Sequence, residues 1–294
     1  MSAIARLRAD PALAALRRSL DVYYGAAARD AAMDRLYARF LAPGDLAFDI
    51  GSHVGDRIGS FRRLGCRVVA LEPQPDCARV VRGLYEDDPG VTLIEAACGP
   101  VTGRLALQVN SANPTVTTAS QDFVRSAAGQ AGWEGQVWDR TIEVPVATLD
   151  TLIGEHGMPA FVKIDVEGFE ADVLAGLSHE VPALSFEFTT IQRDVAYRCL
   201  QRLEQISLAE GDGGSGKVGA VPYRGAPQPR PLPGRGRGGP VGSGDGYRFN
   251  VALGESQRLM LPDWVSGEEM AAHIRALPHE ANSGDVYAIA TVAG

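Results

Sequence analysis

The sequence predicts a doubly wound α/β fold, and three stretches carry this prediction. Residues 46–55 (LAFDIGSHVG) read as a short apolar strand that ends in a carboxylate and two glycines, with a helix starting near residue 56. Residues 67–72 (RVVALE) form a second buried strand that ends in an acid. Residues 160–168 (AFVKIDVEG) suit a central parallel strand, because they are apolar apart from Lys163 until the acids begin. In such a sheet, ligands bind outside the carboxyl ends of the strands.

Composition limits the classes of protein to which the chain can belong. With 294 residues and 45% hydrophobic content it can bury a full core, and one α/β domain with additions is the simplest partition. The net charge of −8 argues against a nucleic-acid partner, which usually requires a basic face. No apolar run approaches the roughly 20 residues of a membrane span, and the N-terminus lacks the apolar region of a signal peptide. Four scattered cysteines indicate free thiols in a reducing compartment. We therefore expect a cytoplasmic protein, and its oligomeric state stays open.

Two helical segments precede the first strand, at residues 11–20 and 29–41. Apolar residues of the second fall at helical spacing, so we expect these helices to pack on the sheet edge or to cover the cofactor. The remaining pattern alternates between buried strands and amphipathic helices, as in a doubly wound sheet. Further strands are expected at residues 91–95, 105–109, 142–146, 182–188, 247–253 and 286–292. Further helices are expected at residues 57–64, 76–85, 148–153, 170–177, 194–206 and 266–277.

Capping side chains predict where three of these helices begin. Asp76 is the expected N-cap of the helix that follows the second strand, and Thr148 is the expected cap of a later one. Ser266 and Glu269 have the spacing of a capping box, in which each side chain accepts a backbone N–H at the start of the helix. We therefore expect the last helix to begin there.

Two segments lack periodicity. Residues 110–135 are rich in small and polar side chains, so they form either a disordered insertion or a lid that contacts substrate. Residues 209–246 are dominated by glycine and proline and cannot bury enough apolar surface to offset ordering entropy. We expect a disordered insertion there, with a basic interaction segment or a gene-model artefact as alternatives. The predicted organisation is helices in residues 1–42, followed by one domain in 43–294 that contains this insertion.

The turn after the first strand is the expected cofactor site. Gly51 and Gly55 let the backbone approach a ligand closely, and Asp49 places a negative charge in the same crevice. That charge suits a cationic ligand such as S-adenosylmethionine better than a phosphate. Glu72 stands where an acid holds a ribose diol in Rossmann-like sites. The small residues after the third strand leave room for an adenine ring or simply form a tight loop. The expected cofactor-binding set is Asp49, Gly51, Ser52, His53, Gly55, Glu72, Pro73, Ala96, Ala97 and Asp165.

Acidic residues at strand ends are the candidate catalytic groups. Asp165 and Glu167 are two residues apart, so their side chains point the same way if the chain stays extended. Buried carboxylates are costly unless they are used, because burial disfavours the charged form. Glu187, near the end of the strand at 182–188, is a third candidate base, and His53 is a weaker one. We expect no metal, since no convincing ligand spacing is present, although a divalent metal on these carboxylates remains an alternative.

Four motifs together resemble the FkbM family of S-adenosylmethionine-dependent methyltransferases. They are FDIGSHVG at 48–55, VALEP at 69–73, ATLD at 147–150 and VKIDVEGFE at 162–170. The resemblance implies a class I methyltransferase fold, a seven-stranded and mostly parallel sheet with an antiparallel last strand. It implies O-methylation of a sugar, glycoside or other small natural product. It also implies that the first motif lines the cofactor's amino-acid end, that Glu72 takes the ribose hydroxyls, and that Asp165 lies beside the methyl group.

Two other functions stay open on the sequence alone. A nicotinamide-dependent oxidoreductase would also use Glu72 for a ribose, but the chain lacks the Gly-x-Gly-x-x-Gly turn, and Asp49 would face a pyrophosphate. A binding protein with a degenerate methyltransferase domain would show no cofactor affinity, or affinity without turnover.

Overall fold

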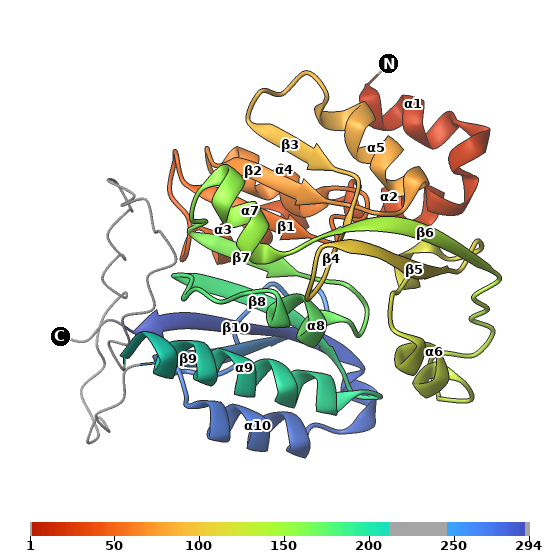
Figure 1. Ribbon diagram of the computed structural model, residues 1–294. Helices are drawn as coiled ribbons and strands as arrows, with labels where there is room; N and C mark the ends of the chain where they lie inside the picture. Colours follow the sequence, from red (N-terminus) through yellow and green to blue (C-terminus); the bar gives the residue numbers. More distant parts are fainter. Residues whose placement is uncertain (1, 212–245, 292–294) are drawn as a thin grey trace.

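A computed structural model describes residues 2–211 and 246–291, and one seven-stranded sheet forms its centre (Figure 1). The strand order is β3-β2-β1-β7-β8-β10-β9. The first five strands in this order run parallel, whereas β10 is antiparallel to both of its neighbours. This topology confirms the predicted fold class. The strands are β1 (Leu46–Ile50), β2 (Arg67–Leu71), β3 (Val91–Ile94), β7 (Phe161–Ile164), β8 (Ala183–Thr189), β9 (Gly246–Leu253) and β10 (Ser283–Thr291).

Helices cover both faces of the sheet. One face packs against α3 (Ala27–Tyr37), α4 (Asp56–Arg63) and α5 (Pro75–Tyr85). The other face packs against α7 (Leu149–His156), α8 (Glu170–Ala175), α9 (Arg193–Gly211) and α10 (Gly267–Ala276). The central strand β7 is buried along its whole length, as its sequence predicted. Two aromatic side chains of α3 and β7, Tyr37 and Phe161, meet edge to face with ring centroids 5.4 Å apart.

The N-terminal segment differs in its boundaries from the single helix expected at residues 11–20. It contains α1 (Ala3–Ala9), the 3₁₀ helix η1 (Pro11–Leu16) and α2 (Arg17–Tyr23). Leu13, inside η1, has non-helical backbone angles, and regular α-helix resumes only at Arg17. Leu16 and Leu20 pack against Val54 of the glycine turn and Val80 of α5. The segment therefore covers the turn where the cofactor was expected.

A second, smaller sheet lies beside the carboxyl ends of the main sheet. Its order is β4-β6-β5, with β4 (Ala97–Cys98), β5 (Gly103–Val109) and β6 (Arg140–Ala147). The segment between β5 and β6, residues 110–139, carries the 3₁₀ helix η2 (Pro114–Val116) and α6 (Gln121–Ala127), and we call it the cap segment. It is ordered and projects beyond the strand ends in Figure 1, as a lid would and a disordered insertion would not.

Helix caps and ends confirm some expectations and correct others. Thr148 caps α7, and the capping box of Ser266 and Glu269 opens α10, as predicted. The N-cap of α5 is Gln74 rather than Asp76, because the Gln74 side chain accepts the backbone N–H groups of Asp76 and Cys77. α9 continues to Gly211 instead of ending near residue 206, so it takes in the start of the expected insertion.

The rest of the glycine- and proline-rich stretch, residues 212–245, lies outside the described residues. Disorder of that stretch therefore stays a prediction. The division of the chain at residue 42 also stays a prediction. A short 3₁₀ helix, η3 (His279–Ala281), precedes β10. Within the described residues, no helix combines the length and apolar character needed to cross a membrane.

Candidate active site

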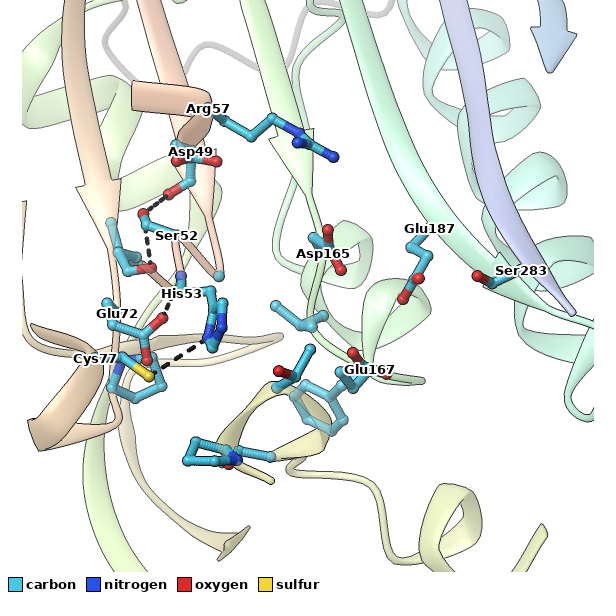
Figure 2. A pocket seen from close by; sticks show the side chains of 18 of the residues that line it. Asp49, Ser52, His53, Arg57, Glu72, Cys77, Asp165, Glu167, Glu187 and Ser283 are labelled. Atoms are coloured by element: carbon cyan, nitrogen blue, oxygen red, sulfur yellow. Dashed lines mark hydrogen bonds between the residues drawn. The ribbon is translucent and has the colours of Figure 1, made fainter. Parts of the chain in front are cut away.

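A cavity of about 340 Å³ lies at the carboxyl ends of β1, β2, β7 and β8. In Figure 2, His53 and Glu72 lie on one side of it, and Asp165, Glu167 and Glu187 lie on the other. All the predicted site residues except Gly55 line this cavity, namely Asp49, Gly51, Ser52, His53, Glu72, Pro73, Ala96, Ala97, Asp165, Glu167 and Glu187. One cavity thus gathers residues from four strand ends, because the carboxyl ends of parallel strands meet at one edge of the sheet.

The two glycines of the turn after β1 have different tasks. A Cβ atom on Gly51 would lie 1.9 Å from the backbone oxygen of Asp165, so only glycine lets these two turns touch. Gly51 also has a φ of +83°, which L side chains rarely adopt. Gly55 precedes α4 with a φ of +80°, and its carbonyl accepts a 2.8 Å hydrogen bond from the Tyr85 hydroxyl. Gly51 therefore shapes the cavity wall, and Gly55 shapes the helix start behind it.

Asp49 presents an unsatisfied carboxylate to the cavity. Its side chain is 1% exposed, and its Oδ2 has no hydrogen-bond partner among the described residues. Burial, helped by the nearby Asp56 carboxylate, raises the pKa of Asp49 to about 7, although the Arg57 and Lys163 cations act in the opposite direction. A buried acceptor of this kind is costly without a donor, so the arrangement favours a cationic ligand group at this point.

Glu72 is held rigidly at the end of β2. Its Oε2 accepts the backbone N–H of His53 at 2.7 Å, and its Oε1 accepts the backbone N–H of Gln74 at 2.8 Å. Burial raises the pKa of Glu72 to about 8, and the two N–H donors oppose that shift. Each carboxylate oxygen has a further lone pair, so two hydroxyl donors can still bind.

His53 is engaged on both ring nitrogens. Nε2 lies 2.9 Å from the Ser19 hydroxyl of α2, and Nδ1 lies 3.4 Å from the Cys77 sulfur of α5. Burial lowers the pKa of His53 to about 4. The φ of His53, +47°, is unusual for a residue other than glycine. The Tyr23 and His53 rings meet edge to face, with their centroids 6.0 Å apart. These contacts give His53 a place in the packing of the turn.

The turn after β7 brings its acids together in a way the sequence did not predict. The strand ends at Ile164, and Glu167 has a φ of +54°, so the chain is not extended across Asp165 and Glu167. Oε1 of Glu170 accepts the backbone N–H groups of Val166 at 3.1 Å and Gly168 at 3.2 Å. The two side chains face the same cavity because this turn is tight and internally bonded, not because of strand alternation.

Asp165, Glu167 and Glu187 form a carboxylate cluster whose ligand oxygens lie within 4.8 Å of one another. Burial and mutual repulsion raise the pKa values of Glu167 and Glu187 well above the ordinary range. Oε2 of Glu187 is buried and has no hydrogen-bond partner among the described residues. Such a set can accept a proton, and its oxygens are also of the type that hard divalent cations prefer.

Two charged residues of the cavity wall, Arg57 and Glu255, were not predicted from the sequence. Arg57 of α4 donates to Asp56 at 2.6 Å and to Glu255, in the loop after β9, at 3.2 Å. Arg29 donates to the same two carboxylates at 2.7 and 2.8 Å. The Arg57 and Arg29 cations lower the pKa of Glu255 to about 2. Among the described residues that line the cavity, Arg57 alone carries a permanent positive charge. No local pattern marks Arg57 or Glu255, because their pairing joins residues 198 positions apart.

The cap segment supplies the remaining wall. Thr117 and Trp133 line the cavity, and Thr117 Oγ1 and Trp133 Nε1 are buried without a hydrogen-bond partner among the described residues. The Thr118 hydroxyl donates a 2.6 Å hydrogen bond to the backbone oxygen of Glu167. The segment is therefore tied to the turn that carries the acids, and it offers polar atoms that a ligand can satisfy.

Comparison with known proteins identifies the family. Residues 49–198, half of the chain, match the family described as the methyltransferase FkbM domain. The chain belongs to this family. The predicted resemblance is thereby confirmed, and the chain carries a methyltransferase domain of the class that uses S-adenosylmethionine.

Similarity to individual proteins is weaker. The chain is 26% identical over 153 residues to the hexuronic acid methyltransferase AglP of Haloferax volcanii. The match covers 51% of this chain and 57% of that relative, so the chain spans little more than half of its length.

Two solved structures resemble the fold, with low scores. A precorrin-6y C5,15-methyltransferase from Geobacter metallireducens is 12% identical, with 90% of this chain and 87% of that chain covered and a TM-score of 0.39. An S-adenosylmethionine-dependent methyltransferase from Thiobacillus denitrificans, in complex with S-adenosylhomocysteine, is 9% identical, with 90% and 92% covered and a TM-score of 0.37. No functional conclusion follows at this level of similarity.

The residues that line the cavity fit the chemical groups of S-adenosylmethionine. The unpartnered Oδ2 of Asp49 suits the cofactor's ammonium group, and the free lone pairs of Glu72 suit a ribose diol. The missing side chain at Gly51 lets the turn after β1 touch the backbone of Asp165, so both turns line one cavity. Ala96 and Ala97 are buried small residues that line the cavity.

Proposed function

We propose that this protein is an S-adenosylmethionine-dependent O-methyltransferase that acts on a hydroxyl of a sugar, glycoside or other small natural product. One observation carries the proposal: the carboxylate cluster of Asp165, Glu167 and Glu187 lies in the same cavity as the glycine turn and Glu72. A cofactor bound along the turn and a hydroxyl bound at the cluster would share one cavity. That proximity is the main requirement of a direct methyl transfer.

The cofactor supplies a methyl group on a positively charged sulfur. In our proposal Asp49 accepts the cofactor's ammonium group, Glu72 accepts its ribose hydroxyls, and Ala96 and Ala97 flank its adenine. Asp165 lies between these groups and the other acids, which supports a position beside the methyl group. Its negative charge would complement the sulfonium.

Glu167 and Glu187 are the best candidates for the general base. Burial and the neighbouring acids raise the pKa values of Glu167 and Glu187 well above the ordinary range, so either carboxylate, where ionised, holds a proton more tightly than an exposed one. The acceptor's oxygen would form a bond to the methyl carbon as the sulfur–carbon bond breaks, and the hydroxyl proton would pass to one of these carboxylates. His53 is less suited, because both of its ring nitrogens already have partners and its pKa is lowered to about 4.

The charge of the wall bears on the acceptor. Against the single cation of Arg57, the cavity lining carries eight carboxylates: Asp49, Asp56, Glu72, Asp165, Glu167, Glu187, Glu255 and Asp285. Asp56 and Glu255 are paired with Arg29 and Arg57, and Asp165 and Asp285 are paired with Lys163. The four acids without a cation would disfavour a negatively charged acceptor wherever they are ionised. The relative named a hexuronic acid methyltransferase supports a sugar acceptor. The charge favours a neutral or amino-bearing sugar over a free uronic acid.

A screen for methyl transfer tests this function. The protein is incubated with S-adenosylmethionine labelled in its methyl group and with pairs of acceptors, each a neutral glycoside matched to its uronic acid and its amino sugar. We expect label in an ether-linked methyl group of a neutral or amino-bearing member. Calorimetry with NAD and S-adenosylhomocysteine is run beside it. Binding of NAD without binding of S-adenosylhomocysteine would replace this function with that of an oxidoreductase.

A further inference from the structure

Lys163 is a charged side chain fully buried inside the central strand. Its side chain is 1% exposed, and its Nζ donates to Oδ2 of Asp165 at 3.1 Å and to Oδ1 of Asp285 at 2.8 Å. The two carboxylates come from different parts of the sheet, the end of β7 and the start of β10, with β8 lying between these strands. Lys163 therefore links the site to the antiparallel strand 122 residues further along the chain.

Stability alone does not account for this link. Burying charges costs several kcal/mol for each ion, and replacing a buried pair with apolar residues of similar volume is often neutral or stabilising. Along its own strand Lys163 is flanked by apolar residues, and Phe161 and Ile164 are fully buried. Across the sheet it pairs with two buried polar residues, Asp49 of β1 and Ser185 of β8. A buried cation in this strand therefore suggests a role for the carboxylate to which it is bonded.

That group is Asp165, which lines the cavity. Lys163 engages its Oδ2, and no hydrogen bond among the described residues engages its Oδ1. The Lys163 ammonium cannot swing away, because Asp285 holds it from the other side. Asp285 is itself fixed by the sheet, where its Cα pairs with that of Glu187 across β8 and β10.

We propose that Lys163 and Asp285 are positioning residues that fix the Asp165 carboxylate so that its free oxygen faces the sulfonium of S-adenosylmethionine. The inference rests on the proposed function, since it assumes that this cofactor occupies the cavity. Lys163 and Asp285 carry opposite charges, so together they add no net charge beside the sulfonium. Their contribution is the place and orientation of Asp165.

The test compares the binding of two ligands that differ in charge at sulfur. S-adenosylmethionine carries the sulfonium, whereas S-adenosylhomocysteine is neutral there and shares the remaining contacts. The ratio of their dissociation constants, measured by calorimetry, therefore reports how well a carboxylate faces the sulfur. The Asp165→Asn variant defines the ratio without that carboxylate. The decisive variant is the double change Lys163→Met with Asp285→Leu, because it removes the link without changing net charge.

We expect the wild-type protein to prefer S-adenosylmethionine, and the double variant to lose about fivefold or more of that preference, close to the value of Asp165→Asn. Its melting temperature should stay near that of the wild type, since both buried charges are removed together. A folded double variant with the wild-type ratio would overturn the inference. Failure of the wild-type protein to bind either ligand would instead overturn the proposed function, so the two failures are distinguishable.

Two comparisons complete the design. Arg62→Met with Asp88→Leu also removes one ion pair, 2.8 Å long and outside the cavity lining, and should leave the ratio unchanged. If the double variant does not fold, Asp285→Asn and Asp285→Leu take its place. They change the charge equally, but only asparagine keeps an oxygen for the Lys163 ammonium. A larger loss of preference in the leucine variant supports the inference, and equal ratios in the two variants overturn it.

Discussion

The backbone N–H of His53 donates a 2.7 Å hydrogen bond to Oε2 of Glu72, which joins the glycine turn after β1 to the end of β2. The acid proposed to hold the cofactor's ribose thus also fixes the loop proposed to hold its amino-acid end. Gln74 donates to the other oxygen of the same carboxylate. A substitution of Glu72 should therefore weaken the contacts to both the ribose and the amino-acid end of the ligand.

Glu72→Ala should weaken the binding of S-adenosylhomocysteine. Hydrogen bonds to charged groups contribute about 1.5–3 kcal/mol each, so the loss of one or two of them predicts a dissociation constant at least tenfold higher. The Glu72→Gln variant keeps one acceptor oxygen, so its dissociation constant should lie between those of the wild type and the alanine variant. Calorimetry on folded variants checks this. Equal affinity in the alanine variant would remove Glu72 from the cofactor site.

Cofactor affinity should rise as pH increases from 6 to 8. Burial raises the pKa of Asp49 to about 7 and that of Glu72 to about 8, so both acids hold protons at pH 6 in the free protein. An ammonium group and ribose hydroxyls favour the ionised carboxylates, so binding at low pH must release those protons. The gain should reach several-fold per pH unit and level off above pH 8.

Calorimetry in buffers with different ionisation enthalpies measures the released protons directly. Glu72→Gln should flatten the upper part of the pH profile and leave the part due to Asp49. Affinity that is independent of pH, with no proton release, would show that neither acid contacts the ligand in its charged form.

The positions of the main acids could be predicted because parallel strands end at a common edge. Asp49, Glu72 and Asp165 each follow an apolar run in the sequence, and all three line the one cavity. The approach of Gly51 to Asp165 could not be predicted, because it depends on the pairing of β1 with β7. Partners at long sequence separation, such as Lys163 with Asp285, leave no local trace either.

Two local errors have physical reasons. Asp76 was expected to cap α5. Proline is favoured at the first helical position, so the helix starts at Pro75 and the cap is the residue before it, Gln74. Glu167 was placed on an extended chain, whereas Gly168, with a φ of +86°, and the hydrogen bonds accepted by Glu170 fold the chain into a turn. In both cases the residue next to the expected one decided the geometry.

Variants of the acid cluster should separate binding from turnover. Asp165→Asn and Glu167→Gln should each lower kcat, by about 10²–10⁴ where the residue is the base, while S-adenosylhomocysteine affinity changes far less. Glu187→Gln should follow Glu167→Gln if the two share the proton. Methyl transfer to an acceptor found in the screen checks this. Near wild-type rates in all three would make the cluster structural.

His53→Asn should retain most of the turnover. Asparagine tolerates the positive φ of this position better than most residues, so the turn should survive the change. Because the ring nitrogens bond to Ser19 and Cys77, we expect a loss of melting temperature and a rate within about tenfold of the wild type. A loss of about 10³ in kcat with unchanged cofactor affinity would instead make His53 the base.

Calorimetric titration of the wild-type protein with S-adenosylhomocysteine, repeated with Asp49→Asn, tests whether the cavity binds the cofactor in the proposed orientation. We expect one binding site per chain and a dissociation constant at least tenfold higher in the variant, because the unpartnered carboxylate oxygen is the proposed partner of the ligand's ammonium group. Absence of binding to the wild-type protein, or equal binding to the variant, would contradict this expectation.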